Sequence, residues 1–171
     1  MKIFVISDTH FGHRSLADKY QTRPNDFENR IIHNWQKMVS DKDLIIHLGD
    51  VIIGKESDWK SVISELPGRK ILVAGNHDKK TLSWYLTNIF EFCCNEFYWY
   101  MYGMRILFSH EPRFEGRFDM NIHGHLHHPN HHPEYKCDER HCLISLENTS
   151  YQPQMLKSIV VKWQQSNKAG N

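Results

Sequence analysis

Three absences narrow the class of protein. Only four cysteines occur in 171 residues, too few for a disulfide-stabilised scaffold, and this favours reduced thiols in a cytoplasmic protein. No long apolar run occurs: the opening MKIFVIS stops at Asp8, so the sequence predicts neither a signal peptide nor a membrane span. Neither charge dominates, because 21 Lys and Arg residues balance 20 Asp and Glu residues. An extensive nucleic-acid-binding surface is therefore not expected.

The composition that remains is that of an ordinary globular domain. Hydrophobic residues make up 40% of the chain and charged residues 24%, which argues against disorder. A chain of this length can bury one substantial core but is short for two. No internal repeat or low-complexity linker divides the sequence, so we expect a single domain over residues 1–171.

The first half of the chain alternates strand and helix patterns. Short runs of β-branched residues predict strands over residues 3–7, 44–48 and 71–74. Two amphipathic helices are expected between them, one beginning after Asn25 or Asp26 and one capped by Ser57. This order of elements predicts parallel pairing of the three strands.

The second half of the chain has a different character. We expect a hairpin of residues 97–102 and 105–108, then a strand over 143–146 and a helix over 154–164. In the first hairpin strand, Tyr98, Tyr100 and Tyr102 alternate with apolar residues. We interpret this segment as a strand buried on both faces, with a base-stacking platform as the alternative.

Residues that bind metals follow five successive predicted strands. A lone Asp or His at a strand end is most often a structural or capping residue, but five such ends indicate a site. In open α/β sheets, the carboxyl ends of the strands line the binding site. The five ends read Asp8-Thr9-His10, Gly49-Asp50, Gly75-Asn76-His77-Asp78, Ser109-His110 and Gly124-His125-Leu126-His127.

These motifs, in this order, resemble the signature of the calcineurin-like metallophosphoesterases. The family pattern is Asp-x-His, Gly-Asp, Gly-Asn-His-Asp/Glu, a lone His and Gly-His-x-His, and every part is present here. The opening Ser-Asp-Thr-His-Phe-Gly-His looks like a small bacterial and phage-type branch of that family. The resemblance implies an α/β fold with a two-sheet β-sandwich flanked by helices. The length leaves no room for a cap domain.

The resemblance also implies a two-metal site. It assigns Asp8, His10 and His127 to one metal, Asn76, His110 and His125 to the other, and Asp50 to both as a bridge. Mixed imidazole, carboxylate and amide ligands suit divalent transition metals better than Mg²⁺ or Ca²⁺. We expect Mn²⁺ foremost, with Fe²⁺, Ni²⁺, Co²⁺ or Zn²⁺ as alternatives.

The expected chemistry is attack of a metal-bridging hydroxide on phosphorus. Two divalent ions, two carboxylates and one hydroxide leave the site at about +1, which attracts a phosphate anion. The leaving alkoxide needs a proton, and His77 is the candidate donor because the resemblance places it outside the ligand set. Asp78 is expected to orient His77; a helix cap at Lys79 is a compatible role for the same residue.

Substrate-binding residues are harder to identify. His13, Arg14 and Arg113 lie close in sequence to the metal-binding motifs, and an arginine fork holds phosphate oxygens well. Arg117 is a further candidate of the same kind, and for each arginine an ordinary surface position is the alternative. His47 lies in an apolar strand and is expected to be a hydrogen-bonded core residue.

A second group of histidines follows the last motif. His123 is expected to pack in the core or to lie beside the metal ligands instead of binding metal, whereas His128, His131 and His132 are expected in an extended loop because prolines interrupt them. A separate zinc site is the alternative for this loop. It would combine these loop histidines with Cys137, His141 and Cys142.

The sequence therefore predicts a dinuclear metal-dependent phosphoesterase. Its expected substrate is a small phosphodiester or phosphomonoester, most plausibly a nucleotide. A metal-dependent nuclease is the alternative that the same site supports, although the balanced charge counts against it. A non-catalytic scaffold on the same fold would lack ligands or His77, and here none is missing.

Overall fold

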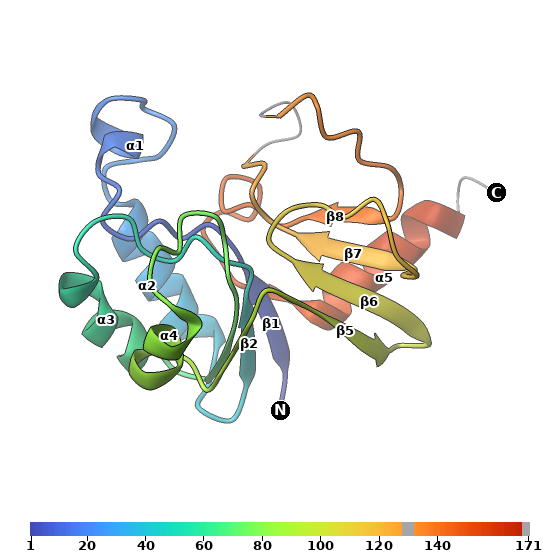
Figure 1. Cartoon of the computed structure of the whole chain (residues 1–171), viewed down its shortest axis with the longest axis horizontal. Helices are drawn as coiled ribbons and strands as arrows, with labels where there is room; N and C mark the ends of the chain where they lie inside the picture. The colour runs from blue at the N-terminus through green and yellow to red at the C-terminus, as the bar shows by residue number, and fades with distance from the viewer. Residues whose placement is uncertain (128–131, 169–171) are drawn as a thin grey trace.

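Two mixed β-sheets stack at the centre of the molecule, and helices flank them (Figure 1). The computed structural model describes residues 1–127 and 132–168. The first sheet has the order β4-β3-β2-β1-β9 and the second β5-β6-β7-β8. This is the single α/β domain with a two-sheet sandwich that the sequence predicts.

The first sheet contains the three predicted parallel strands. They are β1 (Ile3–Ile6), β2 (Leu44–His47) and β3 (Arg69–Val73), and the short β4 (Phe92–Cys94) extends them in parallel. Residues of β9 (Gln154–Met155) pair antiparallel with β1 at its free side. The expected helix over 154–164 therefore begins two residues later, because its first two residues complete this sheet.

The second sheet begins with the predicted hairpin. It consists of β5 (Glu96–Met101) and β6 (Met104–Ser109), which pair antiparallel. The strands β7 (Met120–His123) and β8 (His141–Leu143) then add in parallel. The strand predicted over 143–146 lies earlier in the chain than expected, because the register joins His141 to Asn121 and Leu143 to His123.

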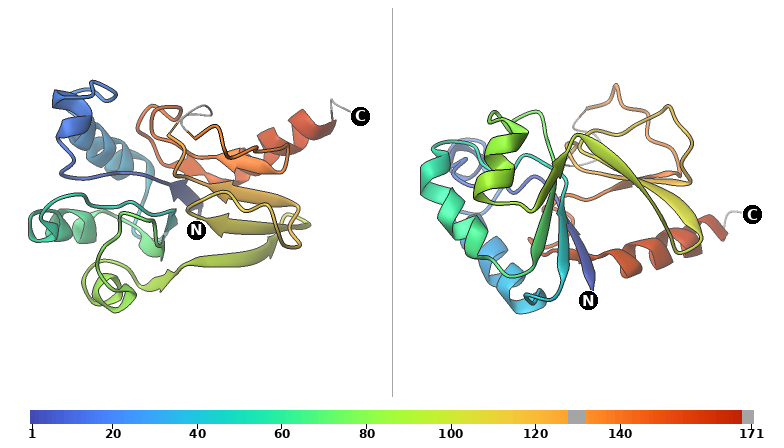
Figure 2. Two further views of the ribbon diagram at one scale, coloured as in Figure 1. Left: turned by 45° about the horizontal axis from the view of Figure 1, so that its top comes forward. Right: turned by 60° about the horizontal axis from the view of Figure 1, so that its bottom comes forward.

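The helices pack at two sites: on the outer face of the first sheet and beside the core between the sheets (Figure 2). Three of them, α2 (Phe27–Met38), α3 (Glu56–Glu65) and α4 (Leu82–Asn88), pack on the face of the first sheet that points away from the second. The helix α5 (Leu156–Lys168) contributes Leu156, Ile159 and Val160 to the core between the sheets. A single turn, α1 (Ser15–Asp18), follows the first metal-binding motif.

The helix starts differ in part from the expected caps. The N-cap position of α2 is Asp26, but its carboxylate pairs with Arg30 and caps no backbone N–H. The predicted cap Ser57 is wrong, since α3 begins at Glu56 and places Ser57 inside the helix. The backbone N–H of Trp84 donates to Thr81 Oγ1 at the start of α4.

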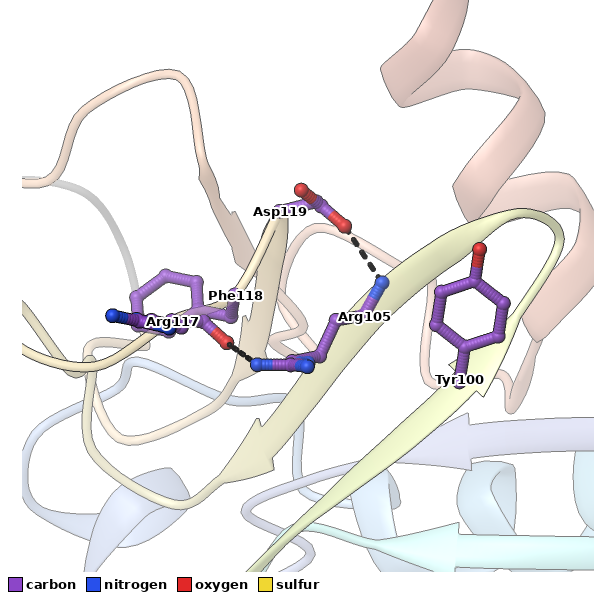
Figure 3. Close-up of a pocket in the computed structure, with 5 residues that line it drawn as sticks. All are labelled: Tyr100, Arg105, Arg117, Phe118 and Asp119. Atoms are coloured by element: carbon purple, nitrogen blue, oxygen red, sulfur yellow. Dashed lines mark hydrogen bonds between the residues drawn. The ribbon is translucent and has the colours of Figure 1, made fainter.

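The strand β5 is not buried on both faces. It is an edge strand whose apolar residues face the core, while Tyr98, Tyr100 and Tyr102 are 48%, 73% and 45% exposed. Figure 3 shows Tyr100 and Arg105 on the outer side, where they line a pocket of about 310 Å³. No helix covers this part of the sheet among the described residues, which explains the wrong prediction.

Other general expectations can be compared with the structure. All four cysteines are free thiols. Within the described part of the chain, no helix has the length and apolar character needed to cross a bilayer. The core histidine is confirmed: His47 is fully buried, and its ring nitrogens contact Thr9 Oγ1 at 2.9 Å and the N–H of Gly49 at 3.1 Å.

Candidate metal centre

The ends of β1, β2, β6 and β7 bring the predicted ligands together where the two sheets meet. Ligand atoms of Asp8, His10 and His127 lie within 4.8 Å of one another, and so do those of Asp8, Asp50 and His110. Four of these side chains are buried, and His127 is partly buried. The site is therefore a cluster of carboxylates and imidazoles shielded from water.

Left-handed backbone concentrates at this site. Nine non-glycine residues in the described chain have positive φ, a conformation that side chains with a Cβ disfavour. Five of the nine are predicted metal ligands. Such strain persists where the surrounding structure enforces it, and it clusters at functional sites. These five are Asp8 (53°), His10 (48°), Asp50 (56°), His125 (67°) and His127 (48°).

The turn after β1 leaves polar atoms without partners. The Oδ2 atom of Asp8 accepts hydrogen bonds from Ser7 Oγ and from the backbone N–H of His125, which joins the two sheets. The Oδ1 atom of Asp8 and both ring nitrogens of His10 are buried without a hydrogen-bonding partner. Buried polar atoms are rarely left unpaired. A bound cation would satisfy Asp8 Oδ1 together with His10 Nε2, which lies 3.8 Å from it, so the residues fit a metal ion.

The carboxylate of Asp50 lies between the two sides of the cluster. Its Oδ2 atom is 3.7 Å from His10 Nε2 and 3.6 Å from His110 Nε2. Its Oδ1 atom accepts the backbone N–H of His77 at 2.8 Å, which fixes the carboxylate in place. This position is the one that a bridging ligand requires.

A second convergence of acceptor atoms lies beside Asp50. The Nδ1–H of His110 donates to the carbonyl of Leu48 at 2.7 Å, so its Nε2 lone pair points toward Asn76 Oδ1 at 2.8 Å. The Nδ1 atom of His125 is 3.0 Å from the same oxygen and 3.2 Å from His110 Nε2. Three potential acceptors at these distances suit a cation between them.

The electrostatics of the cluster favour the same conclusion. Burial, against the opposing effect of His110 and with a smaller contribution from the negative charge of Asp8, raises the pKa of Asp50 to about 6. Burial also acts to raise the pKa of Asp8, but the close approach of His10 and the other nearby histidines holds it well below its usual value. Burial lowers the pKa of His10 to about 4, so its imidazole is neutral at physiological pH. A neutral imidazole beside a carboxylate has a nitrogen lone pair available to bind a metal ion.

Two glycines allow the backbone to approach this closely. A Cβ atom at Gly124 would overlap Ser7 Oγ and Asp8 Oδ2, and one at Gly75 would overlap Asp50 Oδ1. The glycines in the predicted motifs are thus required by contact with the ligands themselves.

The contacts of Asp78 differ from the expected ones. Its two carboxylate oxygens accept the backbone N–H groups of Asp50, Val51 and Gly75 and the hydroxyl of Tyr85. These four donors engage both oxygens, so Asp78 fixes the Asp50 loop, and no hydrogen bond joins it to the His77 ring. The helix-cap role is wrong as well, because α4 begins three residues beyond Lys79.

Two other histidines stand beside the cluster. His77 is exposed, and its ring centroid is 5.9 Å from that of His10. The ring centroid of His13 is 5.6 Å from that of His10, and its Nδ1 atom is buried without a partner. The structure thus places both His77 and His13 next to the ring of His10.

The predicted phosphate-binding arginines are already engaged. The guanidinium of Arg14 donates to Glu28 and Asp18 and to the carbonyl of Asn25. The guanidinium of Arg113 pairs with Glu96 at 2.8 Å and lies 3.9 Å from Glu111. Neither arginine makes a hydrogen bond to a predicted metal ligand in the described structure.

The histidine-rich loop is described in part. His128 and His131 lie outside the described residues, whereas the ring of His132 stacks on His125 with centroids 4.9 Å apart. No metal-competent cluster of the described residues includes Cys137, Cys142 or His141. Both ring nitrogens of His141 instead contact Asp138 and the carbonyl of Arg113. The packing role of His123 is confirmed, since it is 1% exposed.

Sequence reasoning missed two charged residues at the centre. The guanidinium of Arg23 is buried beneath the β1 turn, and Glu147 lies beside His127. They form an ion pair of 2.8 Å across a separation of 124 residues. Neither lies in a metal-binding motif, so no local signal identifies them.

Comparison with known proteins agrees with this geometry. A family model for calcineurin-like phosphoesterases matches residues 1–167. The chain belongs to the calcineurin-like phosphoesterase family. The two clusters of buried Asp and His residues are consistent with the dinuclear metal site typical of this phosphoesterase family.

Several individual proteins are similar to this chain. The uncharacterized protein MJ1445 of Methanocaldococcus jannaschii is 39% identical over 84 residues, covering 46% of this chain and 47% of that protein. The gene 66 protein of Mycobacterium phage D29 is 30% identical over 80 residues, covering 45% and 40%. The matched region thus spans less than half of either relative. The crystal structure of AQ665 from Aquifex aeolicus, a protein of unknown function, has a TM-score of 0.76 at 28% identity, covering 92% of this chain and 97% of that one.

Proposed function

We propose that this protein is a dinuclear metal-dependent phosphoesterase that hydrolyses a small phosphodiester or phosphomonoester of the nucleotide class. The observation that carries the proposal is the position of Asp50 Oδ2, 3.7 Å from His10 Nε2 and 3.6 Å from His110 Nε2. A single carboxylate oxygen thus faces both groups of ligands. We infer that Mn²⁺ is the preferred metal, because mixed nitrogen and oxygen ligands suit a divalent transition metal.

We assign two metal positions. In the first position, the ligands are Asp8, His10 and His127, whose ligand atoms lie within 4.8 Å of one another. In the second position, the ligands are Asn76, His110 and His125, whose facing atoms lie 2.8 to 3.2 Å apart. Asp50 is shared by both. With only two carboxylates in the set, a loaded site remains positive and attracts phosphate.

When bound, the metal ions supply Lewis acidity and lower the pKa of water, so that hydroxide is available near neutral pH. The chain's own residues prepare the site for that chemistry. Asp8 and Asp50 are held by backbone N–H groups of His125 and His77, so their free oxygens point inward. These two hydrogen bonds keep the carboxylates in one arrangement before substrate binds.

His77 is the proposed proton donor to the leaving oxygen. Its backbone N–H is anchored on Asp50 Oδ1, while its ring is exposed and 5.9 Å from the ring of His10. A proton on a ring nitrogen is thus available at the open side of the cluster, where the departing alcohol leaves. His13 lies on the same side and is the proposed contact for the substrate.

A nuclease is the second candidate, and one observation favours it. Tyr98 and Tyr100 are exposed on one face of β5, Tyr102 is exposed in the turn that follows, and Tyr100 stands opposite Arg105 in the pairing register. Exposed aromatic rings beside arginines bind single-stranded nucleic acid by stacking and charge. Figure 3 shows Arg105 between Tyr100 and Arg117 in the pocket that these residues line.

A substrate screen tests the proposal. Metal-free protein is loaded with Mn²⁺ and assayed against nucleotides, cyclic nucleotides, aryl phosphate esters and oligonucleotides. We expect hydrolysis of at least one small ester that a chelator abolishes. Absence of any metal-dependent hydrolysis would contradict the proposal. Hydrolysis of oligonucleotides alone, weakened by Tyr100→Ala, would support the nuclease instead.

A further inference from the structure

Arg23 carries a buried charge beside the metal centre. Its side chain is 0% exposed, although it belongs to the loop between α1 and α2. A charge in the interior is costly unless it is paired and hydrogen-bonded. Here the guanidinium has an ion pair with Glu147 at 2.8 Å, and it lies 5.3 Å from the centroid of the Phe27 ring. The position is therefore stabilised on several sides.

The same guanidinium supports the first metal-binding turn. Its Nη2 donates to the carbonyl of Asp8 at 2.9 Å, and its Nη1 donates to the carbonyl of Thr9 at 3.2 Å. These carbonyls belong to the turn in which Asp8 and His10 have φ of 53° and 48°. A left-handed backbone at residues with a Cβ needs such external support. Arg23 supplies it from a loop that contributes no metal ligand.

Glu147 provides the second half of the arrangement. Its Oε1 atom is 3.3 Å from His127 Nδ1, while His127 Nε2 is 4.0 Å from Asp8 Oδ1. Arg23 Nη2 also lies 3.5 Å from this nitrogen, but the carboxylate is nearer, and it favours the proton on Nδ1 and leaves the lone pair on Nε2. The lone pair then points into the cluster of Asp8 and His10.

We propose that Arg23 and Glu147 are positioning residues for the first metal position. Glu147 sets the tautomer and ring orientation of His127, and Arg23 orders both Glu147 and the backbone of Asp8. The inference rests on the proposed function, because it needs a metal at the position of Asp8, His10 and His127. It goes beyond that function by assigning metal affinity to two residues outside the ligand set.

The arrangement differs from an ordinary buried ion pair in one testable respect. A purely structural pair would change the stability of the metal-free fold and leave metal affinity alone. A positioning pair changes the affinity of one metal position selectively. Partners of this kind typically contribute about 10–100-fold in metal affinity.

The test is a metal titration of the metal-free protein, with Mn²⁺ alone as the probe and heat as the readout. In wild type we expect two binding events, and the event lost in His127→Ala identifies the first position. In Glu147→Ala that event should weaken by about 10–100-fold. Glu147→Gln keeps an acceptor for His127 Nδ1 and should weaken it less. Asp26→Asn, in the exposed pair with Arg30, is the matched control and should leave both events unchanged.

A variant that keeps the negative charge near Arg23 separates a loss of metal affinity from a loss of the fold. Glu147→Asp retains an anion near Arg23 but shortens its reach to His127, so the first event should weaken although thermal unfolding shows a folded protein. A ¹⁵N spectrum of the metal-free protein adds a direct readout: the His127 proton should sit on Nδ1 in wild type and redistribute in Glu147→Ala.

The outcomes separate this inference from the proposed function. If wild type binds no Mn²⁺, the proposed function fails and the inference fails with it. If wild type binds two ions and all three folded Glu147 variants bind them with wild-type affinity, the inference alone is overturned. Equal weakening of both events would also overturn it, because the support is assigned to the first position only.

Discussion

The proposed first metal position lies deeper than the second, and two charged residues outside its ligand set support it. Asp8 and His10 are 0% and 3% exposed, and the Arg23–Glu147 pair contacts both the Asp8 carbonyl and His127. In the second position Asn76 is exposed and His125 is partly exposed. The imidazole of His125 contacts Asn76 and His110, which are ligands of the same position.

This difference separates two tasks within one site. Ligands that are buried and supported by other residues lose little freedom when an ion binds, which favours affinity. Ligands at the open side leave room for the substrate to reach the metal and for the product to leave. We therefore expect the first position to retain its ion and the second to exchange it more readily.

The bridging residue gives the largest expected effect, because it belongs to both positions. Asp50→Asn keeps the acceptor for the His77 N–H but removes the negative charge between His10 and His110. We expect weaker binding at both positions and hydrolysis at the uncatalysed level. Elemental analysis and an ester hydrolysis assay measure the two effects, with Asp26→Asn as the control. Two tightly held ions in Asp50→Asn would show that the positions do not share this ligand.

A substitution of His77 tests the open side of the cluster, because it removes no ligand of either metal position. His77→Ala should lower turnover by about 10²–10⁴-fold on an alkyl ester, the range typical of general acid catalysis. An aryl ester should lose less, because its leaving group departs as a stabilised anion. Metal content, measured by elemental analysis, should match wild type since every ligand remains. Equal losses on both esters would assign His77 to charge stabilisation, and loss of one ion would place it among the ligands.

The sequence predicts which polar residues lie together at this edge of the sheets, for a physical reason. Carboxyl ends of neighbouring parallel strands meet at one edge, so Asp8, Asp50 and Asn76 are brought together by the topology alone. The hairpin and the strand β7 deliver His110 and His125 to the same edge in the second sheet. These residues are recognisable because each lies directly after an apolar run.

The features that the sequence did not predict depend on contacts between distant segments. Arg23 and Glu147 are 124 residues apart, and each lies in a loop with no periodic pattern. The wrong burial expected for β5 has a similar cause, because aromatic residues on both faces do not reveal which face is covered. The strand β9 exists only because β1 offers a free edge to Gln154 and Met155.

The two positions can be compared directly by removing one ligand from each. His127→Ala should weaken the tighter of two binding events, and His125→Ala the looser one, each by at least about tenfold, or about 1.4 kcal/mol. Stepwise titration of the metal-free protein with Mn²⁺ measures both events. Loss of the looser event in His127→Ala would reverse the order of affinities inferred from burial.

The smallest expected effect concerns the loop beside the second position. The ring of His132 stacks on His125 with centroids 4.9 Å apart and an interplanar angle of 15°, and Glu134 holds it from the other side. Aromatic pairs of this kind contribute about 0.5–1.5 kcal/mol, and His132 is partly exposed, so the lower end applies. His132→Ala should therefore weaken the second binding event only about twofold, since 0.5 kcal/mol corresponds to about that factor.

The same substitution should leave the first event unchanged, because the contact between Glu147 and His127 Nδ1 does not involve the ring of His132. Both events are read from one titration of His132→Ala against wild type. A loss of the second ion would show that His132 is a ligand of that position. The loop would then belong to the metal centre itself. An equal change at both positions would show that the loop acts on the shared Asp50, and the separation between an enclosed and an open position would no longer hold.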